Sequence, residues 1–227
     1  MKICCLSDLH GTLLPVEDFN KCELVCICGD SVPLEIQANS RKTKKWLKNE
    51  FKSWCESLPC DKVIFIAGNH DLHYNLAFMY ENFPKDAKVT YLFHEKYIYT
   101  AKSGKEYSIF GTPYCKQFGY WAYMEDNETL DKLFSQIPEK LDILLTHDQP
   151  YGFGDVLTED VPWNTGEHIG NKPLTKAVLE KQPNYMFTGH LHSTAHDCVM
   201  INNTKRYNVS INNERYNPIY DPLYLDI

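Results

Sequence analysis

The sequence predicts a β-rich α/β sandwich from three observations: buried-type apolar runs, amphipathic helical segments and two hairpin patterns. Five short runs are rich in Ile, Val, Leu, Phe and Cys, and they do not alternate cleanly between apolar and polar residues. Strands that are covered on both faces have this character. The runs are residues 2–7, 24–28, 62–67, 141–145 and 184–187.

Four segments between the runs have helical character. In residues 38–58, large apolar residues recur at helical spacing and form a stripe that can lie on a sheet. The rest of that segment is basic, and we interpret it as a solvated helix face, with a polyanion-binding face as the alternative. The other three segments are residues 75–82, 127–136 and 172–181.

Two hairpins complete the expected elements. Residues 97–101 and 106–111 flank one turn, and residues 197–201 and 205–209 flank the other. Between the hairpins, residues 114–123 concentrate aromatic side chains without a steady period. That segment is either a packed loop core or a wall that faces a ligand.

Length and composition set broad limits. A chain of 227 residues without a Gly/Ser-rich or Pro-rich linker is expected to form one domain, residues 1–227. No apolar stretch approaches the ~20 residues of a membrane span, and no signal-peptide pattern precedes the first run. We therefore expect a cytoplasmic protein without a membrane partner. Its oligomeric state is left open.

Charge and cysteine content narrow the class further. A net charge of -7 disfavours a broad affinity for nucleic acid, although bound cations can make a site locally positive. The nine cysteines include no Cys-x-x-Cys pair. We interpret them as small buried hydrophobes in a reducing compartment rather than as disulfides or zinc ligands.

A polar cluster follows each of the five apolar runs. In open α/β sheets, side chains beyond the carboxyl ends of the strands meet in one crevice, so these clusters are expected to form a single site. The clusters are Asp8-Leu9-His10-Gly11, Gly29-Asp30, Gly68-Asn69-His70-Asp71, Thr146-His147 and Gly189-His190-Leu191-His192.

The residue types in the clusters point to metal-assisted chemistry. The carboxylate of Asp30 can lend one oxygen to each of two cations, and a metal pair ~3.5–4 Å apart can bind a phosphoryl group and activate water. The mixture of imidazole, amide and carboxylate ligands suits Mn, Fe or Zn better than Ca. His70 is adjacent to Asn69 and is better placed to face a substrate, while Asp71 is expected to fix its tautomer or keep it protonated.

In order and spacing, the five clusters resemble the calcineurin-like metallophosphoesterase superfamily over essentially the whole chain. The resemblance implies a four-layer αββα double β-sandwich. It also implies two divalent or mixed-valence metal ions and hydrolysis of a phosphoester by a metal-activated hydroxide, with His70 contacting the phosphate or the leaving group. The implied ligands are Asp8, His10 and His192 for the first metal, Asp30 as the bridge, and Asn69, His147 and His190 for the second.

A narrower resemblance concerns three stretches: residues 144–152, residues 111–113 with Trp121-Ala122, and residues 207–226. They are similar to the small metallophosphoesterase-domain-containing proteins of animals, a class III cyclic nucleotide phosphodiesterase-like group. That group is linked to phosphodiesters, including cyclic nucleotides. The chain departs from it at Asp148-Gln149 and at Asp71, where the group tends to have other residues.

These observations predict a phosphodiesterase that acts on a small-molecule phosphoester such as a nucleotide, with His70 and Asp71 as catalytic residues. The alternatives are a phosphomonoesterase or protein phosphatase, and a non-catalytic metal-binding scaffold. The long loop of residues 151–171 is expected to cover the metal centre and shape the substrate pocket, with a surface excursion as the alternative. Within it, Trp163 either stacks on a base or anchors the loop.

Overall fold

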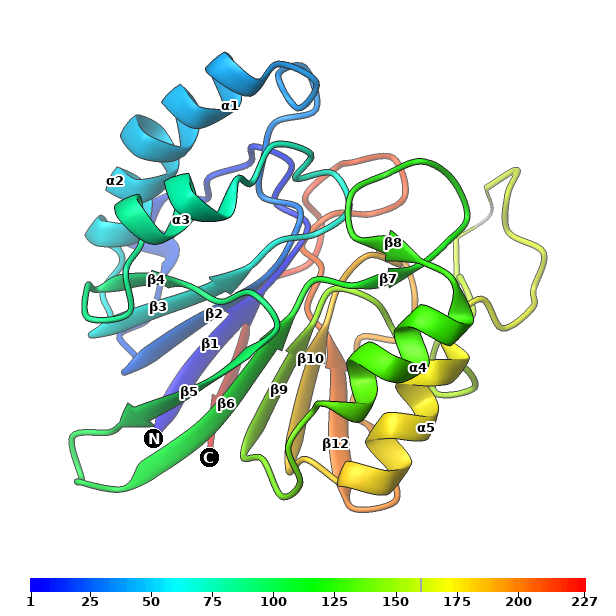
Figure 1. Ribbon diagram of the computed structural model, residues 1–227. Coiled ribbons are helices and arrows are strands. Elements are labelled where there is room, and N and C mark those ends of the chain that lie inside the picture. The colour runs from blue at the N-terminus through cyan, green and yellow to red at the C-terminus, as the bar shows by residue number, and fades with distance from the viewer. Residues whose placement is uncertain (160) are drawn as a thin grey trace.

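We describe the fold from a computed structural model, for residues 1–159 and 161–227. Two large sheets form its centre (Figure 1). The first has the strand order β13-β1-β2-β3-β4, and all neighbours are parallel except β13 and β1. Its strands are β1 (Lys2–Leu6), β2 (Leu24–Cys28), β3 (Lys62–Ile66), β4 (Val89–Tyr91) and β13 (Leu223–Asp226).

The second sheet has the order β11-β12-β10-β9-β6-β5, with parallel pairs at its centre and an antiparallel pair at each edge. A separate two-stranded pair, β7 (Cys115–Lys116) with β8 (Met124–Glu125), lies beyond it. The strands of the second sheet are β5 (Glu95–Thr100), β6 (Glu106–Thr112), β9 (Ile143–Thr146), β10 (Tyr185–Thr188), β11 (Val199–Ile201) and β12 (Thr204–Asn208).

Helices cover the outer face of each sheet, which gives the expected αββα layers (Figure 1). On the first sheet, α1 (Ser40–Trp46) continues through a π-helical turn, Leu47–Phe51, into α2 (Lys52–Ser57), and α3 (Leu76–Asn82) lies beside them. On the second sheet lie α4 (Asn127–Ser135) and α5 (Lys172–Lys181). A short 3₁₀ turn, Val16–Asp18, precedes β2.

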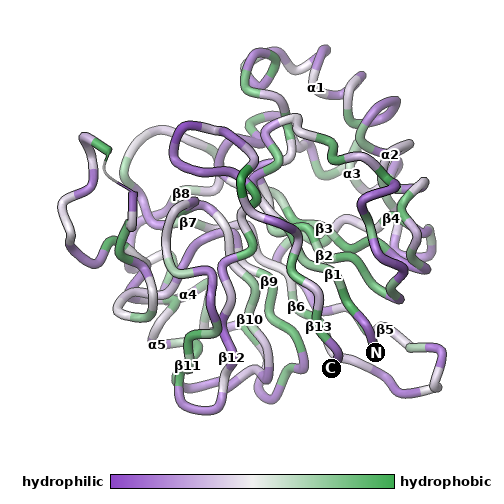
Figure 2. Tube along the Cα trace, turned by 180° about the vertical axis from the view of Figure 1, so that it is seen from behind, coloured by the Kyte–Doolittle hydropathy of each residue, from purple (hydrophilic) through white to green (hydrophobic). Residues whose placement is uncertain are grey.

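The core consists of three apolar layers. Along β2, Val25 and Ile27 pack toward the helices, while Leu24, Cys26 and Cys28 pack toward the second sheet. Both faces of such a strand are buried, which explains why the apolar runs do not alternate. Figure 2 shows the hydrophobic segments concentrated in these central strands and the hydrophilic ones in the outer loops and helices.

The five runs, the four helices and both hairpins are confirmed, with bounds that differ by a few residues. Sequence reasoning missed β4, β7, β8 and β13. Seven of the nine cysteines are buried, as expected of small core residues, while Cys60 is partly buried and Cys198 is exposed. None of the helices in the two described ranges combines the length and the apolar character needed to cross a membrane.

Candidate metal centre

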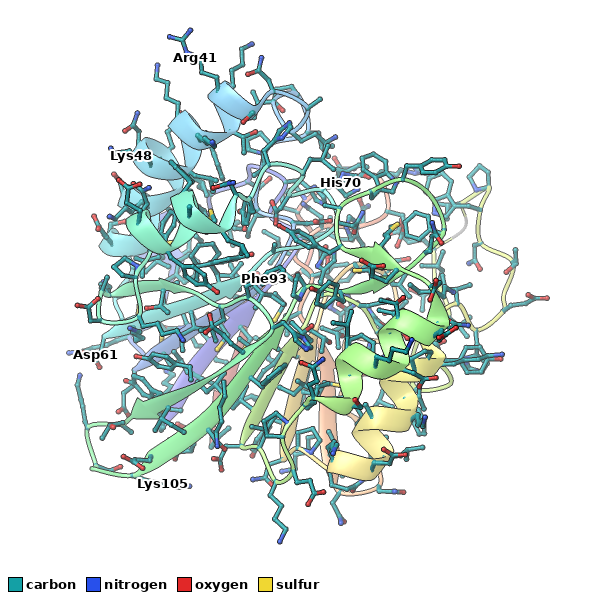
Figure 3. All side chains as sticks on the ribbon, viewed as in Figure 1. Arg41, Lys48, Asp61, His70, Phe93 and Lys105 are labelled. Atoms are coloured by element: carbon teal, nitrogen blue, oxygen red, sulfur yellow. The ribbon has the colours of Figure 1, made fainter. Side chains whose placement is uncertain are left out.

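All nine candidate residues lie in loops at one end of the two sheets. These loops follow the carboxyl ends of β1, β2 and β3 in one sheet and of β9 and β10 in the other, so parallel strands deliver them to a common edge. Figure 3 shows His70 at this end, far from Lys105 in the turn between β5 and β6. The nine residues are Asp8, His10, Asp30, Asn69, His70, Asp71, His147, His190 and His192.

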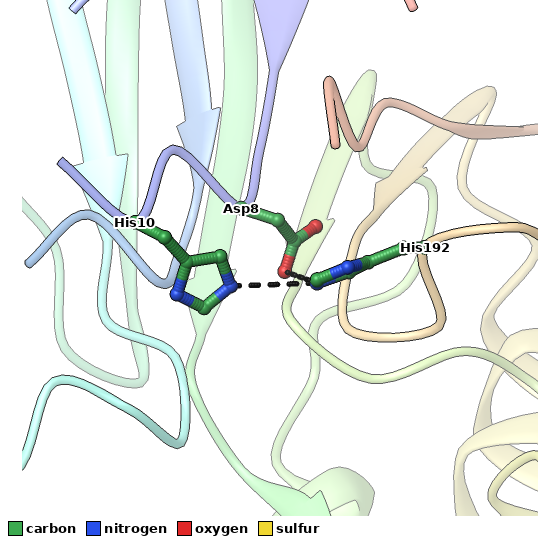
Figure 4. A group of neighbouring side chains, drawn as sticks. All are labelled: Asp8, His10 and His192. Atoms are coloured by element: carbon green, nitrogen blue, oxygen red, sulfur yellow. Dashed lines mark hydrogen bonds and ion pairs between the residues drawn. The ribbon is translucent and has the colours of Figure 1, made fainter. Parts of the chain in front are cut away.

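Asp8, His10 and His192 form a compact group of metal-type side chains (Figure 4). Their ligand atoms all lie within 4.8 Å of one another. The Nε2 atom of His192 lies 3.4 Å from Nε2 of His10 and 3.5 Å from a carboxylate oxygen of Asp8. Two imidazole nitrogens and a carboxylate oxygen directed at one point can hold a transition metal or zinc.

A second group shares Asp8 and adds Asp30 and His147, again with ligand atoms within 4.8 Å of one another. One oxygen of Asp30 lies 3.3 Å from Nε2 of His147 and 3.8 Å from Nε2 of His10, so this carboxylate of the second group also lies near a histidine of the first. The Oδ1 atom of Asn69 lies 2.9 Å from Nε2 of His147. The structure therefore brings the predicted ligands of both sheets together.

Backbone carbonyls orient two of the imidazoles. The Nδ1 atom of His147 donates to the carbonyl of Cys28 at 2.8 Å, and Nδ1 of His192 donates to the carbonyl of Asn213 at 2.8 Å. Each bond leaves Nε2 directed into the cluster, as is usual for metal-ligating histidines. His190 is joined differently, since its backbone N–H donates to the Asp8 carboxylate at 3.0 Å.

The loop backbone is strained where it carries the candidate ligands. Asp8, His10, Asp30 and His190 have φ values of 56°, 43°, 51° and 68°. This left-handed region is uncommon for residues other than glycine, and such strain gathers at functional sites where the surroundings enforce it. The loops around these residues are closely packed: a Cβ atom added to Gly68 would lie 2.5 Å from Cε1 of His147.

The cluster stabilises positive charge. Burial by itself would raise the pKa of Asp8, but His192 outweighs it and holds the pKa of this carboxyl well below its usual range. His147 has the same effect on the pKa of Asp30. Against the lowering effect of burial, Asp30 raises the pKa of His147 to about 10, and Asp8 raises that of His192 to about 9. Two buried, ionised carboxylates with nitrogen and amide donors around them are a donor set that fits metal cations.

His70 is held from three sides at the edge of the cluster. Its Nδ1 atom donates to Oε1 of Gln37 at 2.8 Å, and its ring centroid lies 4.4 Å from that of Trp121. Its backbone N–H donates to Oδ1 of Asp30 at 2.7 Å. Burial lowers the pKa of the His70 imidazole. The ring is thus fixed beside the two Asp/His groups.

The structure corrects the role expected for Asp71. Its carboxylate is fully buried and accepts backbone N–H bonds from Gly68 at 2.8 Å and from Ser31 and Val32 at 3.1 Å. It joins the loops that follow β2 and β3, whereas the side chain that orients the His70 ring is Gln37. Burial, with repulsion from Asp30, raises the pKa of Asp71 to about 7.

A pocket of about 490 Å³ opens over the cluster, and Asp30, Asn69, His70, His190 and His192 lie along it. Aromatic side chains form much of its wall: Phe118, Trp121, Trp163 and Tyr216. The ring of Phe118 stacks on that of His190, with centroids 5.4 Å apart. Both ends of the 118–121 turn therefore lie on imidazoles of the site.

The aromatic segment 114–123 is a packed loop core in one part and a wall of the pocket in another. Tyr114 packs against Phe93 and His94, whereas Phe118 and Trp121 face the pocket. The expected covering loop, residues 151–171, contributes Leu157, Trp163 and Ile169 to the lining. Residue 160 of that loop lies outside the described residues.

Four residues near the site were missed by sequence reasoning: Gln37, Asn213, Glu214 and Tyr216. Glu214 accepts bonds from the backbone of Ser193 at 3.0 Å and from the Trp163 indole at 3.3 Å. The ring centroid of Tyr216 lies 4.8 Å from that of His10. These residues come from irregular segments with no local pattern, so only the tertiary fold reveals their position.

Comparison with known proteins agrees with this geometry. A family model described as calcineurin-like phosphoesterase matches residues 1–194. The human and mouse proteins called metallophosphoesterase domain-containing protein 1 are each 28% identical to the chain, over 98% of this chain and 70% of theirs. The Caenorhabditis elegans UPF0046 protein T07D4.2 is 24% identical over 100% of this chain and 60% of its own length.

Solved structures share the fold at low sequence identity. One is 14% identical with a TM-score of 0.67, and the alignment covers 91% of this chain and 89% of that chain. The structure of TT1561 of Thermus thermophilus is 13% identical with a TM-score of 0.58, and the alignment covers 91% of this chain and 88% of the other.

Proposed function

Since the chain belongs to the calcineurin-like phosphoesterase family, we propose that it hydrolyses phosphodiesters at a dinuclear metal site. The family is metal-dependent and acts on phosphoesters. We assign Asp8, His10 and His192 to the first metal and Asp30 to the bridge. The assigned ligands of the second metal are Asn69, His147 and His190. The observation that carries this proposal is the pair of Asp/His groups that share Asp8 and reach one pocket through Asp30 and His192.

Metal ions bound there would lower the pKa of a coordinated water and neutralise charge on the phosphoryl oxygens. Two of the chain's own residues can contact the substrate directly. The Nδ2 donor of Asn69 is buried with no hydrogen-bond partner among the described residues, and a phosphoryl oxygen is an acceptor that would satisfy it. With Nδ1 held by Gln37, the other nitrogen of His70 is free to bond to the leaving oxygen or to give it a proton.

The lining of the pocket favours a diester over a monoester. A monoester carries nearly two negative charges near neutral pH, and recognition of the extra charge calls for Arg or Lys. Lys116 is the only Arg or Lys among the lining residues that the structure describes. Its ammonium group donates to the carbonyl of Ile169 at 2.6 Å, which commits it to the loop. The aromatic walls suit a flat substituent such as a nucleotide base.

We propose Mn, Fe or Zn as the metals, because the donors mix imidazole nitrogen with carboxylate and amide oxygen. We further propose that residues 1–227 act as one domain, supported by the pairing of β13 with β1. The buried, unpaired cysteines are compatible with a reducing, cytoplasmic compartment.

The test compares paired model substrates on metal-loaded protein. We expect a bis-aryl phosphate diester to be cleaved with a higher kcat/KM than the matching aryl monoester in the presence of Mn²⁺, and Asp30→Ala to abolish both activities. Cyclic nucleotides follow as natural candidates. A preference for the monoester would favour the phosphatase alternative. No turnover of either substrate with two metals bound would favour a non-catalytic scaffold.

A further inference from the structure

The loop that carries His190 and His192 has no regular structure, and side chains from elsewhere hold its carbonyl groups. Residues 189–195 follow β10, and His190 within them adopts a left-handed φ of 68°. Asn208 donates to the carbonyl of Leu191 at 2.9 Å, and His196 donates to that of His192 at 2.8 Å. The loop is therefore shaped by a buried polar network rather than by a helix or strand.

Gln149 lies at the centre of this network and is fully buried. Its Nε2 atom donates to the carbonyls of Gly189 and Leu191, each at 3.0 Å. These two carbonyls stand on either side of His190. One amide group thus holds the peptide unit that leads into His190 and the one that leads into His192, both candidate ligands.

The orientation of the Gln149 amide is determined by chemistry. Its other end contacts the guanidinium of Arg206 and the hydroxyl of Thr194, the latter at 2.8 Å. A guanidinium is only a donor, so the atom that faces Arg206 must be the amide oxygen, and the NH₂ group must face the loop.

Arg206 is itself fully buried, and it also donates to the carbonyl of Ala195 at 2.9 Å. It makes no ion pair with a carboxylate within the described ranges. Burial lowers its pKa to about 9. A buried cation whose hydrogen bonds go to carbonyl oxygens is costly to maintain. Its contacts fasten the amide of Gln149 and the far end of the same loop.

We propose that Gln149, fixed by Arg206, is a positioning residue that holds the 189–195 loop in the conformation in which His190 and His192 can bind metal. The inference rests on the metal site of the proposed function. Outer partners of this kind typically change metal affinity 10–100-fold when they are replaced. Neither side chain would touch the substrate.

The decisive variant is Gln149→Glu, which keeps the size of the side chain and its contact with Arg206. It replaces the NH₂ donor with an oxygen that faces the carbonyls of Gly189 and Leu191. We expect Mn²⁺ affinity, measured by calorimetry on purified protein, to fall about 10–100-fold. Circular dichroism and the melting temperature of the metal-free protein report whether the variant is folded.

Gln182→Glu is a matched control, because Gln182 makes the same kinds of bonds far from the metal centre. Its Nε2 donates to the carbonyls of Val178 at 3.2 Å and Leu179 at 2.8 Å, and its Oε1 accepts from Asn203. We expect this variant to bind Mn²⁺ as the wild type does. A fall equal to that of Gln149→Glu would overturn the inference, since the loss would then be a general effect of the substitution.

Arg206→Lys decides the question if Gln149→Glu does not fold. A lysine retains the buried charge but cannot form the two-sided contact, so we expect a several-fold loss of Mn²⁺ affinity. Wild-type affinity in whichever of the two variants is folded would overturn the inference. His192→Ala, measured in parallel, distinguishes failure of the positioning role from failure of the metal site. Unchanged Mn²⁺ binding in that variant would refute the metal site itself.

Discussion

The orientation of His70 by Gln37 yields a prediction whose magnitude follows from one contact. The bond from Nδ1 of His70 to Oε1 of Gln37 spans 2.8 Å and is partly buried. A bond of this kind contributes about 0.5–1.5 kcal/mol net. If that contribution is present in the transition state, its loss corresponds to a rate decrease of about two- to thirteenfold. We therefore expect Gln37→Ala to lower kcat by this factor with KM nearly unchanged.

Gln37→Glu sharpens the test through pH dependence. Burial lowers the pKa of His70, and a carboxylate at 2.8 Å would favour the protonated ring and raise that pKa. If protonated His70 is the active form, activity should persist to higher pH in this variant, so the alkaline limb of the kcat profile should move upward. Steady-state kinetics on an aryl diester between pH 5 and pH 10 would measure both variants.

A double-variant cycle supplies the refutation. When His70 is already alanine, Gln37→Ala should have no further effect, because Gln37 acts only through that ring. Gln136→Ala is the control, since Gln136 is an exposed glutamine that donates to the carbonyl of Lys132 in α4. If Gln37→Ala is as harmful without His70 as with it, or if the pH profile of Gln37→Glu does not move, the positioning role is wrong.

Three further predictions concern the metal centre. His70→Ala should retain both metals, counted by elemental analysis, and lose roughly 10²–10⁴-fold in kcat; loss of metal would make His70 a ligand instead. Asp30→Ala should lose hydrolysis and bind both metals weakly, whereas His192→Ala should affect mainly one site, as anomalous diffraction can show. Two full-strength sites in Asp30→Ala would contradict the bridge. Chelation of the metal should abolish turnover and lower the melting temperature. The reason is that a ligand at 100 times its Kd stabilises the folded state by about 2.7 kcal/mol. An unchanged melting temperature would mean that the purified protein held little metal.

The sequence predicts which candidate ligands lie together better than it predicts the residues that surround them. Asp8, Asp30 and His147 come directly after apolar strands, and the geometry of parallel sheets brings such positions together. Gln37 and Asn213 lie in irregular segments, and their contacts depend on how distant loops pack. The role of Asp71 was misjudged for a related reason: its carboxylate accepts bonds from backbone amides of its own loop and of the neighbouring loop.

Some strands of the fold can likewise be predicted from the sequence, and others cannot. Strands such as β2 can be recognised in the sequence, because burial on both faces requires several apolar residues in succession. In contrast, β4 has only three residues, and β13 has only four, which lie partly or fully exposed at the edge of the sheet. Pairing with β3 and β1 gives these segments their strand conformation, which is a tertiary effect.

The proposed metal ligands come from both sheets, so the thickness of the layer between the sheets determines how far apart they stand. Asp8 and Asp30 follow strands of the first sheet, and His147 follows a strand of the second. Cys5 and Cys26 on the first sheet lie in the same buried layer as the larger side chains of the second. The small cysteine side chains fit between packed sheets, which lie about 10 Å apart. A bulkier residue in their place would widen the stack, so metal affinity would report on the spacing of a core that contains no ligand.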